Sequence, residues 1–340
     1  MLDEDGIARL AQACFYKNPV IILGSGASLP HGLPSMGQLQ AHLDVNFEAE
    51  AGEQAAWQSV KDSLTAGSHL EQAMAGKTLP ESLVSKLVKE TWKFINVHDR
   101  DVYLKTIQGI EPFPSGRLFD QLFSSSNMEV NVVTTNYDRV VEYACGSVGL
   151  IYSMGFSPGY LQYREGADVF KIYKGNRPVR LVRIWKVHGS LDWFEREDGD
   201  LVAAPLFELP EEVLKPLIVT PGISKYERTH DEPFRTVIQN ADRCLENAEG
   251  YLCVGFGFRD SHIEPKLVER CRRNNIPITV LSRTLTDEAR TFLEKKAGAA
   301  YLAFEKFNDG TKVYTSENPE GVEIPGKNYW SLTGYLQLVT

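Results

Sequence analysis

The sequence predicts an α/β fold, with a Rossmann-like parallel sheet, helices on both faces and an inserted small helical module. Short, continuously apolar segments alternate with segments of helical periodicity, which is typical of parallel strands covered on both faces. A long stretch between the first two such strands, residues 47–128, has a helical pattern and no clear strand. With 340 residues, 43% of them apolar and 24% charged, the chain can build a substantial core, which excludes general disorder.

Each predicted strand is a short run of Val, Ile and Leu bounded by turn residues. The predicted strands span residues 19–23, 130–134, 181–187, 217–220, 251–255 and 278–281. The predicted helices lie between them and carry apolar residues at helical spacing. They begin near Ser35, follow Asp138, and span about 233–247, 263–274 and 287–297. Residues 156–180, rich in Tyr and Gly, predict a loop or a hairpin.

These elements predict three parts of the chain. Residues 1–46 and 129–304 would form the sheet domain, and residues 47–128 the inserted module. One helical face of that module is formed by Val84, Leu87, Val88, Trp92 and Ile95. Residues 305–340 carry polar turn signals and then an apolar, aromatic end. We expect this segment to be a docked or frayed tail, with a partner or self-association surface as the alternative.

The charge of the chain argues against direct nucleic-acid binding. The formal net charge is −9 and the sequence pI is about 5.4, whereas proteins that bind nucleic acid through bulk charge are basic. One local basic stretch is formed by Lys171, Lys174, Arg177, Arg180, Arg183 and Lys186. We interpret it as a solvated face or a contact for an acidic partner.

Nothing in the sequence predicts a membrane or secretory segment, a disulfide framework or a zinc site. The apolar runs are far shorter than the roughly 20 residues that a bilayer requires, and the first residues are acidic where a secretory signal is basic. The five cysteines are scattered, and no pair has the CxxC spacing of structural zinc sites. We therefore expect a cytoplasmic protein without zinc and without a membrane partner.

A glycine-rich motif, Gly-Ser-Gly-Ala-Ser at residues 24–28, lies where the first predicted strand passes into a helix. Glycines at such a turn let backbone N–H groups approach a pyrophosphate, and the helix N-terminus adds partial positive charge. Position 29 is Leu, so the full GxGxxG dinucleotide pattern is not met. A tight glycine turn without a ligand is the alternative.

Three further motifs end predicted strands. Asn136 and Asp138, in the run Thr-Thr-Asn-Tyr-Asp, would point toward the first glycine loop, and an amide suits a ribose hydroxyl or an attacking water. The alternative is that one of them merely caps the next helix. His188 offers a group that can take a proton near neutral pH. Residues 255–262 form a second Gly-rich turn, in which capping of the next helix accounts for Asp260.

Taken together, these four motifs resemble the catalytic domain of the sirtuin superfamily. They are GSGAS, TTNYD, VHGS and VGFGFRD, in that order and each at a strand end. The resemblance covers about residues 15–300. It implies a Rossmann-like NAD-binding domain that carries a small inserted module.

The resemblance also implies roles for single residues. Those that would line the NAD pyrophosphate are Gly24, Ser25, Gly26, Ala27 and Ser28. Asn136 and His188 would be catalytic. The remaining implied contacts to the nicotinamide ribose, the second turn and the adenosine are Asp138, Gly255, Phe256 and Ser282.

Departures from the sirtuin pattern indicate which group of sirtuin-like proteins the sequence resembles. The two CxxC pairs of protein-deacylating sirtuins are missing, and the first loop continues as Leu-Pro-Ser-Met rather than Pro-Asp-Phe-Arg. The sequence looks closest to the zinc-free bacterial sirtuin-like NADases of anti-phage defence. That likeness implies NAD as substrate, a homo-oligomer, and a separate partner such as a HerA-type ATPase or a short argonaute.

The expected activity is hydrolysis of NAD to nicotinamide and ADP-ribose, in an abortive-infection setting. Nicotinamide in NAD is a cationic leaving group, so the protein has to stabilise an oxocarbenium-like state and place a water. Asn136 would orient that water or the ribose hydroxyls, and His188 would be a base or a hydroxyl anchor. The alternatives are an NAD-dependent protein deacylase or ADP-ribosyltransferase, and a non-catalytic scaffold that binds NAD or ADP-ribose.

Overall fold

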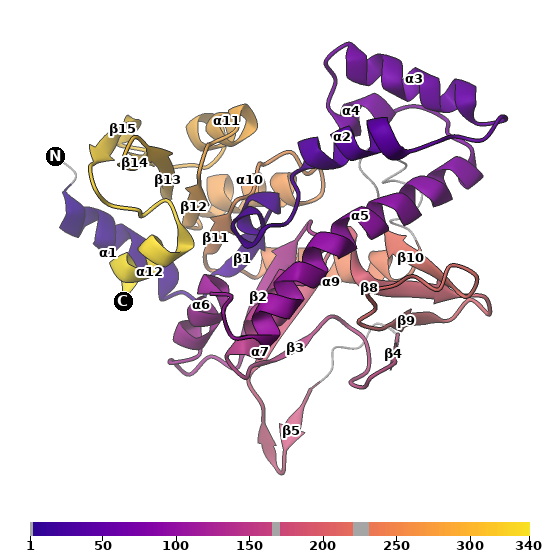
Figure 1. The fold of residues 1–340 in the computed structure, drawn as a ribbon. Coiled ribbons are helices and arrows are strands. Elements are labelled where there is room, and N and C mark those ends of the chain that lie inside the picture. The colour runs from indigo at the N-terminus through magenta and orange to yellow at the C-terminus, as the bar shows by residue number, and fades with distance from the viewer. Residues whose placement is uncertain (1–2, 165–170, 220–230) are drawn as a thin grey trace.

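A nine-stranded, mostly parallel sheet forms the centre of the molecule (Figure 1). The computed structural model describes residues 3–164, 171–219 and 231–340. In sheet order the strands are β15 (Asn318–Ile324), β14 (Gly310–Thr315), β13 (Tyr301–Phe307), β12 (Ile278–Ser282), β11 (Tyr251–Val254), β1 (Val20–Leu23), β2 (Glu129–Thr134), β7 (Leu181–Lys186) and β3 (Ile151–Ser153). All pairings from β13 to β3 are parallel, and β14 and β15 are antiparallel additions at one edge.

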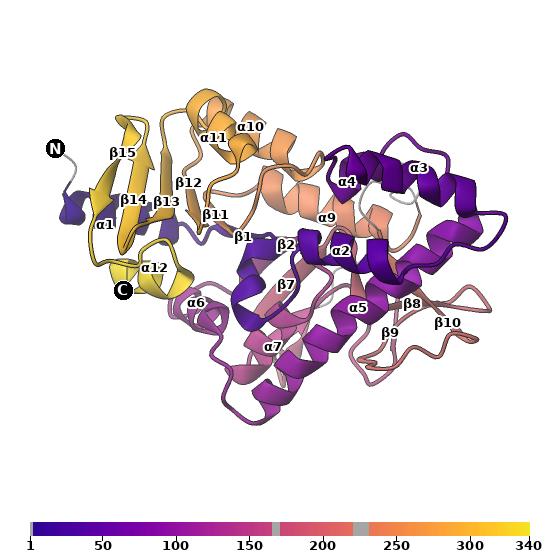
Figure 2. The same ribbon diagram turned by 45° about the horizontal axis from the view of Figure 1, so that its top comes forward.

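The apolar runs form these strands because both faces of the sheet are covered. Every residue of β1, β7 and β11 is buried, as expected of central parallel strands. Figure 2 shows helices on both sides of the sheet. On one side are α9 (Phe234–Glu246), α10 (Ile263–Asn274) and α11 (Asp287–Lys295); on the other are α1 (Glu4–Phe15), α6 (Pro114–Leu122), α7 (Val140–Ser147) and α12 (Leu332–Val339). The predicted Rossmann-like architecture is confirmed.

The winding of the sheet reverses beside β1. The chain passes from β1 to β2 on one side, and β11 later joins β1 on the other side. In such sheets ligands bind outside the carboxyl ends of the strands at the point where the winding reverses. The glycine motif after β1 and the second glycine turn after β11 both lie at this reversal.

The inserted helices have a small core of their own. They are α2 (Met36–Asn46), α3 (Gln54–Thr65), α4 (Leu70–Met74) and α5 (Glu81–Ile107). The helix predicted near Ser35 begins there with a capping box, in which Ser35 and Gln38 bond each other's backbone N–H. Leu39 and Leu43 of α2 share one hydrophobic cluster with Trp57 and Leu87, so α2 packs with the residues that follow it.

A second, antiparallel sheet lies beside the main one. Its strands are β10 (Leu214–Ile218), β8 (Gly189–Arg196), β9 (Leu201–Ala203) and β4 (Gln162–Tyr163). The prediction of a parallel-sheet strand at residues 217–220 was wrong, because this apolar run pairs antiparallel with β8; residue 220 lies outside the described residues. The hairpin predicted within residues 156–180 is confirmed by β5 (Tyr173–Lys174) and β6 (Arg177–Pro178), and residues 165–170 lie outside the described part.

The C-terminal segment adds strands to the sheet, and its apolar end is docked, one of the two expected forms of a tail. One of its turn signals is a hairpin turn, since Asn308, at φ 50°, lies between β13 and β14, whereas residues 318–321 belong to strand β15. The aromatic end forms α12, where Tyr335 is fully buried and its hydroxyl lies 3.4 Å from the Ala11 carbonyl oxygen of α1. Alternating polar residues on edge strands resemble a loop pattern, which explains the difference.

A buried ionic cluster joins the inserted helices and the second sheet to the main sheet at the turn after β2. The Arg139 guanidinium donates to Asp99 of α5 at 2.6 Å and to Asp192 of β8. Tyr143 of α7 donates to the same Asp99 carboxylate at 2.5 Å, and Asn96 accepts from Arg139 at 2.9 Å. Three elements from distant parts of the chain are thus joined one residue after Asp138.

Candidate functional site

The two glycine turns at the sheet reversal interlock through their backbones. The Gly24 N–H donates to the Val254 carbonyl oxygen and the Gly26 N–H to the Gly255 carbonyl oxygen, both at 3.1 Å. A Cβ on Gly24 would lie 2.4 Å from the Gly255 oxygen. Gly255 itself has φ +58°, and a Cβ there would lie 2.3 Å from the Ala27 nitrogen. The glycines are required for this close contact before any ligand is considered.

This packing limits what the first loop can offer to a phosphate. Four of the five backbone N–H groups of residues 24–28 donate to carbonyl oxygens of the two turns or of Val254. The Ser25 N–H and hydroxyl are the remaining donors of the loop. A pyrophosphate bound here would therefore be held chiefly by Ser25 and by the partial positive charge of the turn.

Substituting Gly255 by Ala is expected to separate the two turns. The left-handed conformation costs a non-glycine residue about 1–2 kcal/mol, and the backbone overlap adds to this. Gly257→Ala is the matched control, because its Cβ would meet only the Thr286 Cγ2 atom at 3.5 Å. We expect Gly255→Ala to lower the melting temperature and weaken NAD binding, and Gly257→Ala to change neither. Equal effects from both substitutions would contradict this account of the contact.

Asn136 is tied to the first glycine loop by its side chain. Its Nδ2 group donates to the Gly24 carbonyl oxygen and to the Ser28 hydroxyl oxygen, both at 3.0 Å. The backbone N–H of Asn136 donates to the Thr134 hydroxyl at 3.1 Å. Because both Nδ2 hydrogens are engaged, the Oδ1 acceptor is the group left for a ligand.

Asp138 is buried, and its Oδ1 atom accepts the Val140 backbone N–H at 3.1 Å at the start of α7. This geometry agrees with the capping alternative. Burial raises the pKa of Asp138, whereas Lys186 and a hydrogen bond from Ser28 act to lower it. Ser28 therefore contacts both Asn136 and Asp138, and it links the first glycine loop to the turn that follows β2.

Lys186 stabilises the turn that follows β2 and carries Asn136 and Asp138. It is fully buried at the end of β7, and its ammonium group donates to the carbonyl oxygens of Tyr137 and Asp138. The ammonium nitrogen lies 2.7 Å from Glu142 Oε1 of α7. Burial raises the pKa of Glu142 to about 7 against the opposing effect of Lys186. A buried lysine therefore joins the strand that carries His188 to the turn that carries Asn136.

His188 follows β7 and meets a residue from the second glycine turn. Its Nε2 atom lies 2.9 Å from Asp260 Oδ2, with the two side chains 12% and 5% exposed. The other carboxylate oxygen of Asp260 accepts the backbone N–H groups of His262 at 2.9 Å and Ile263 at 3.0 Å. A nearly buried imidazole and carboxylate thus meet at the same edge of the sheet as Asn136.

Comparison with known proteins finds one family model and several solved structures. Residues 130–298 match the family model described as a SIR2-like domain. This part of the chain is therefore similar to a SIR2-like domain. The matched range contains Asn136, His188 and Asp260.

Solved structures of Sir2 proteins show a distant likeness to this chain. One, from a study of the mechanism and regulation of Sir2 enzymes, has a TM-score of 0.48 and 14% identity, covering 100% of this chain and 98% of that chain. A Sir2 homologue in complex with NAD has a TM-score of 0.45 and 14% identity, covering 89% and 88%. A Sir2 protein bound to acetylated peptide has a TM-score of 0.43 and 13% identity, covering 83% of this chain and 86% of that chain. No curated protein matches the chain.

The other predicted contacts of the SIR2-like domain lie at neighbouring strand ends. Phe256 is buried, with its ring centroid 5.0 Å from that of Phe258, so only its backbone faces a ligand. Ser282, at the end of β12, donates its hydroxyl hydrogen to the Thr284 carbonyl oxygen at 2.7 Å. Within the described residues, no cluster of three or more His, Cys, Asp or Glu is arranged to hold a metal, and no helix is long and apolar enough to cross a bilayer.

Sequence reasoning missed two residues of the site. Asp260 was interpreted as a helix cap alone, whereas its second oxygen contacts His188. Lys186 was assigned to the basic stretch, whereas it is buried against Glu142. A lysine in a short, mostly apolar strand with helices predicted around it is itself a signal for a buried partner.

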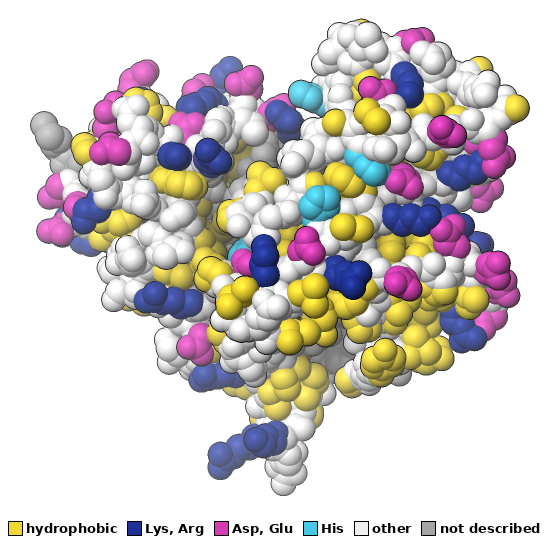
Figure 3. Space-filling view, viewed as in Figure 1, with side chains coloured by type: hydrophobic (Ala, Val, Ile, Leu, Met, Phe, Trp, Pro, Cys, Tyr) yellow, Lys and Arg dark blue, Asp and Glu magenta, His cyan; other side chains and the backbone are white. Residues whose placement is uncertain are grey.

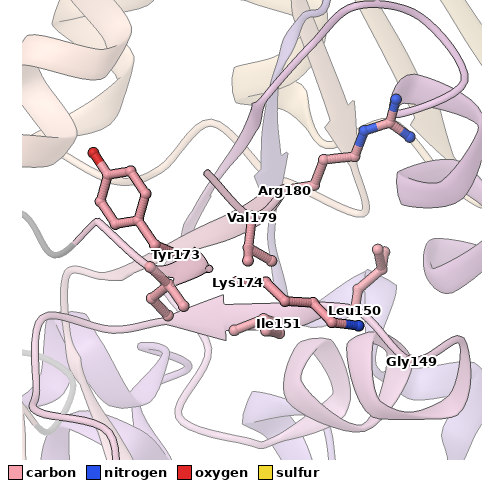
Figure 4. Close-up of a pocket in the computed structure, with 8 residues that line it drawn as sticks. Gly149, Leu150, Ile151, Tyr173, Lys174, Val179 and Arg180 are labelled. Carbon is pink, nitrogen blue, oxygen red and sulfur yellow. The ribbon is translucent and has the colours of Figure 1, made fainter. Parts of the chain in front are cut away.

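The basic stretch is consequently smaller than the sequence suggests. Arg183 also turns inward, to Glu129 at 2.6 Å. The β5–β6 hairpin keeps exposed Lys and Arg side chains and projects from the molecule (Figure 3). Beside it is a hollow of about 530 Å³ (Figure 4). Its lining residues are Gly149, Leu150, Ile151, Ile172, Tyr173, Lys174, Val179 and Arg180, none of them part of the candidate NAD site.

Proposed function

We propose that this SIR2-like chain is an NAD⁺ glycohydrolase that cleaves NAD to nicotinamide and ADP-ribose. One observation carries the proposal. The Asn136 amide is held in a fixed orientation by Gly24 and Ser28, at the same sheet edge as the His188–Asp260 contact. Binding alone needs neither a preset amide nor an imidazole supported by a carboxylate, whereas hydrolysis uses both.

The donor and acceptor groups at this edge fit the chemistry of the NAD ribose. The bond from ribose C1′ to nicotinamide breaks with its electron pair leaving on the nicotinamide nitrogen, so no acid is required. Asn136 Oδ1 accepts a hydrogen bond from the water that attacks C1′, and His188 takes the proton that this water loses. Asp138 supports the ribose side of the site through Ser28.

The test is an assay of the purified chain with NAD alone and with NAD plus an acetyl-lysine peptide. We expect equal amounts of nicotinamide and ADP-ribose without any second substrate. Because an unregulated NADase would poison its own cell, a low initial rate is expected, and the assay is run at several protein concentrations. Nicotinamide release that requires the peptide would replace this proposal by the deacylase or ADP-ribosyltransferase alternative, and binding without cleavage under all conditions would favour the scaffold.

The biological setting is part of the same proposal. The chain acts as the NAD-depleting effector of a bacterial anti-phage system, works as a homo-oligomer, and is activated by a separate HerA-type ATPase or short argonaute. The projecting basic hairpin on a chain of net charge −9 supports contact with an acidic partner or a second copy. NAD should fall after phage infection in cells that carry the chain with its partner, and should not fall when His188→Ala replaces it.

A further inference from the structure

Asp260 divides its two carboxylate oxygens between two different tasks. Oδ1 accepts two backbone N–H groups in the first turn of α10, from His262 and Ile263. Oδ2 lies 2.9 Å from His188 Nε2. A helix cap requires only one of these oxygens, so capping leaves the second contact unexplained.

The surroundings of the His188–Asp260 contact strengthen its electrostatic attraction. Both side chains are nearly buried, so water screens the interaction only weakly. The carboxylate is fixed by two backbone hydrogen bonds, and it sits at the N-terminus of a 12-residue helix, where negative charge is favoured. The His188 backbone is also fixed, because its carbonyl oxygen accepts the Val219 N–H at 2.8 Å. The carboxylate of Asp260 and the backbone of His188 are therefore both fixed by hydrogen bonds.

We infer that Asp260 is a positioning residue for His188: its carboxylate lies at ion-pair distance from Nε2, without hydrogen-bond geometry in the structure, and stabilises the charge that appears when the ring takes a proton. This inference rests on the proposed function and adds a residue to it. With Asp260 at Nε2, the proton-accepting atom is Nδ1. The water oxygen bonds to C1′, the glycosidic electron pair leaves with nicotinamide, and the proton of the water passes to Nδ1. Asp260 stays ionised throughout, as a carboxylate behind a catalytic histidine does.

Asp260→Asn separates the two tasks. Asn is as good a helix cap as Asp, so the melting temperature should stay close to that of the wild type. The charge facing His188 is lost, so kcat for NAD cleavage should fall by about 10–100-fold, with KM changing by less than about threefold. Asp260→Ala removes cap and charge together and should lower both stability and kcat. The control is Asp3→Asn, which changes the aspartate that caps α1 and should alter neither.

A spectroscopic readout makes the test independent of activity. In protein labelled with ¹⁵N at histidine, the ring signals of His188 are identified by their loss in His188→Ala. Asp260→Asn should shift those signals, and Asp3→Asn should leave them in place. If the signals shift and the wild type does not cleave NAD, the contact stands and the proposed function fails. Cleavage by Asp260→Asn at the wild-type rate, or unshifted His188 signals, would overturn the positioning role.

Discussion

His188→Ala is expected to lower kcat for NAD cleavage by about 10²–10⁴-fold, the usual contribution of a positioned acid–base group. The substitution removes the only imidazole in contact with Asp260 among the described residues, while the Val219 contact to the His188 backbone stays. The fold should therefore survive. NAD binding, measured by calorimetry, should weaken far less than kcat, because the ring acts on the water rather than on the bulk of the dinucleotide.

Asn136→Ala should abolish cleavage to a similar degree, with an added loss of stability. The Ser28 hydroxyl oxygen loses its donor, and such a loss costs about 1–3 kcal/mol for a buried group, whereas the Gly24 carbonyl loses one of two donors and keeps the Ala27 N–H. Because Asn136 and His188 would act on the same water, the double variant should be hardly slower than either single one.

Matched controls distinguish these effects from general damage. His42→Ala removes a histidine that also lies against a carboxylate, Glu90 at 2.7 Å, but in the inserted helices. Asn247→Ala removes an amide that bonds the Arg243 carbonyl at the end of α9. Both controls should cleave NAD at the wild-type rate. Undiminished nicotinamide release by a folded His188→Ala or Asn136→Ala protein would remove that residue from the mechanism.

The strands and the helix start that carry the site could be predicted from the sequence, because the residues that form each element lie next to one another in the chain. The short apolar runs of β1, β2, β7 and β11 favour buried parallel strands, and Ser35 with Gln38 defines the start of α2. Since the carboxyl ends of parallel strands share one edge, the convergence of the motifs followed from the strand prediction alone.

Pairing between distant segments could not be predicted in the same way. An apolar strand does not specify its neighbour. The strand predicted at residues 217–220 was therefore placed in the parallel sheet, whereas its described part pairs antiparallel with β8. The His188–Asp260 contact joins positions on opposite sides of β1, and it depends on the strand order of the finished sheet. Lys186 and Glu142 meet only because β7 lies next to the turn after β2.

Lys186→Met is the substitution with the largest expected effect on stability. Removing one partner of a buried ion pair costs about 3–5 kcal/mol, because the other charge is left in a medium of low polarity. Here the carbonyl oxygens of Tyr137 and Asp138 lose a donor as well. The turn that holds Asn136 should loosen, so NAD binding should weaken along with the free energy of unfolding. Lys93→Met is the control, since its pair with Glu211 is solvent-exposed and worth at most about 1 kcal/mol.

The destabilisation caused by Lys186→Met should depend on pH, through Glu142. Burial already raises the pKa of Glu142 from 4.5 to about 7, and without the ammonium group it rises further. Between the unfolded and folded pKa values the folded state binds more protons than the unfolded state, so the free energy of unfolding falls as pH rises through that window. Urea unfolding should therefore show a smaller deficit for Lys186→Met at pH 5 than at pH 8. Adding Glu142→Leu removes the buried carboxylate and should restore part of the lost stability and reduce this pH dependence, leaving the contribution of Asp138. A deficit that is the same at both pH values would show that the lost carbonyl bonds, and not the stranded carboxylate, dominate the effect.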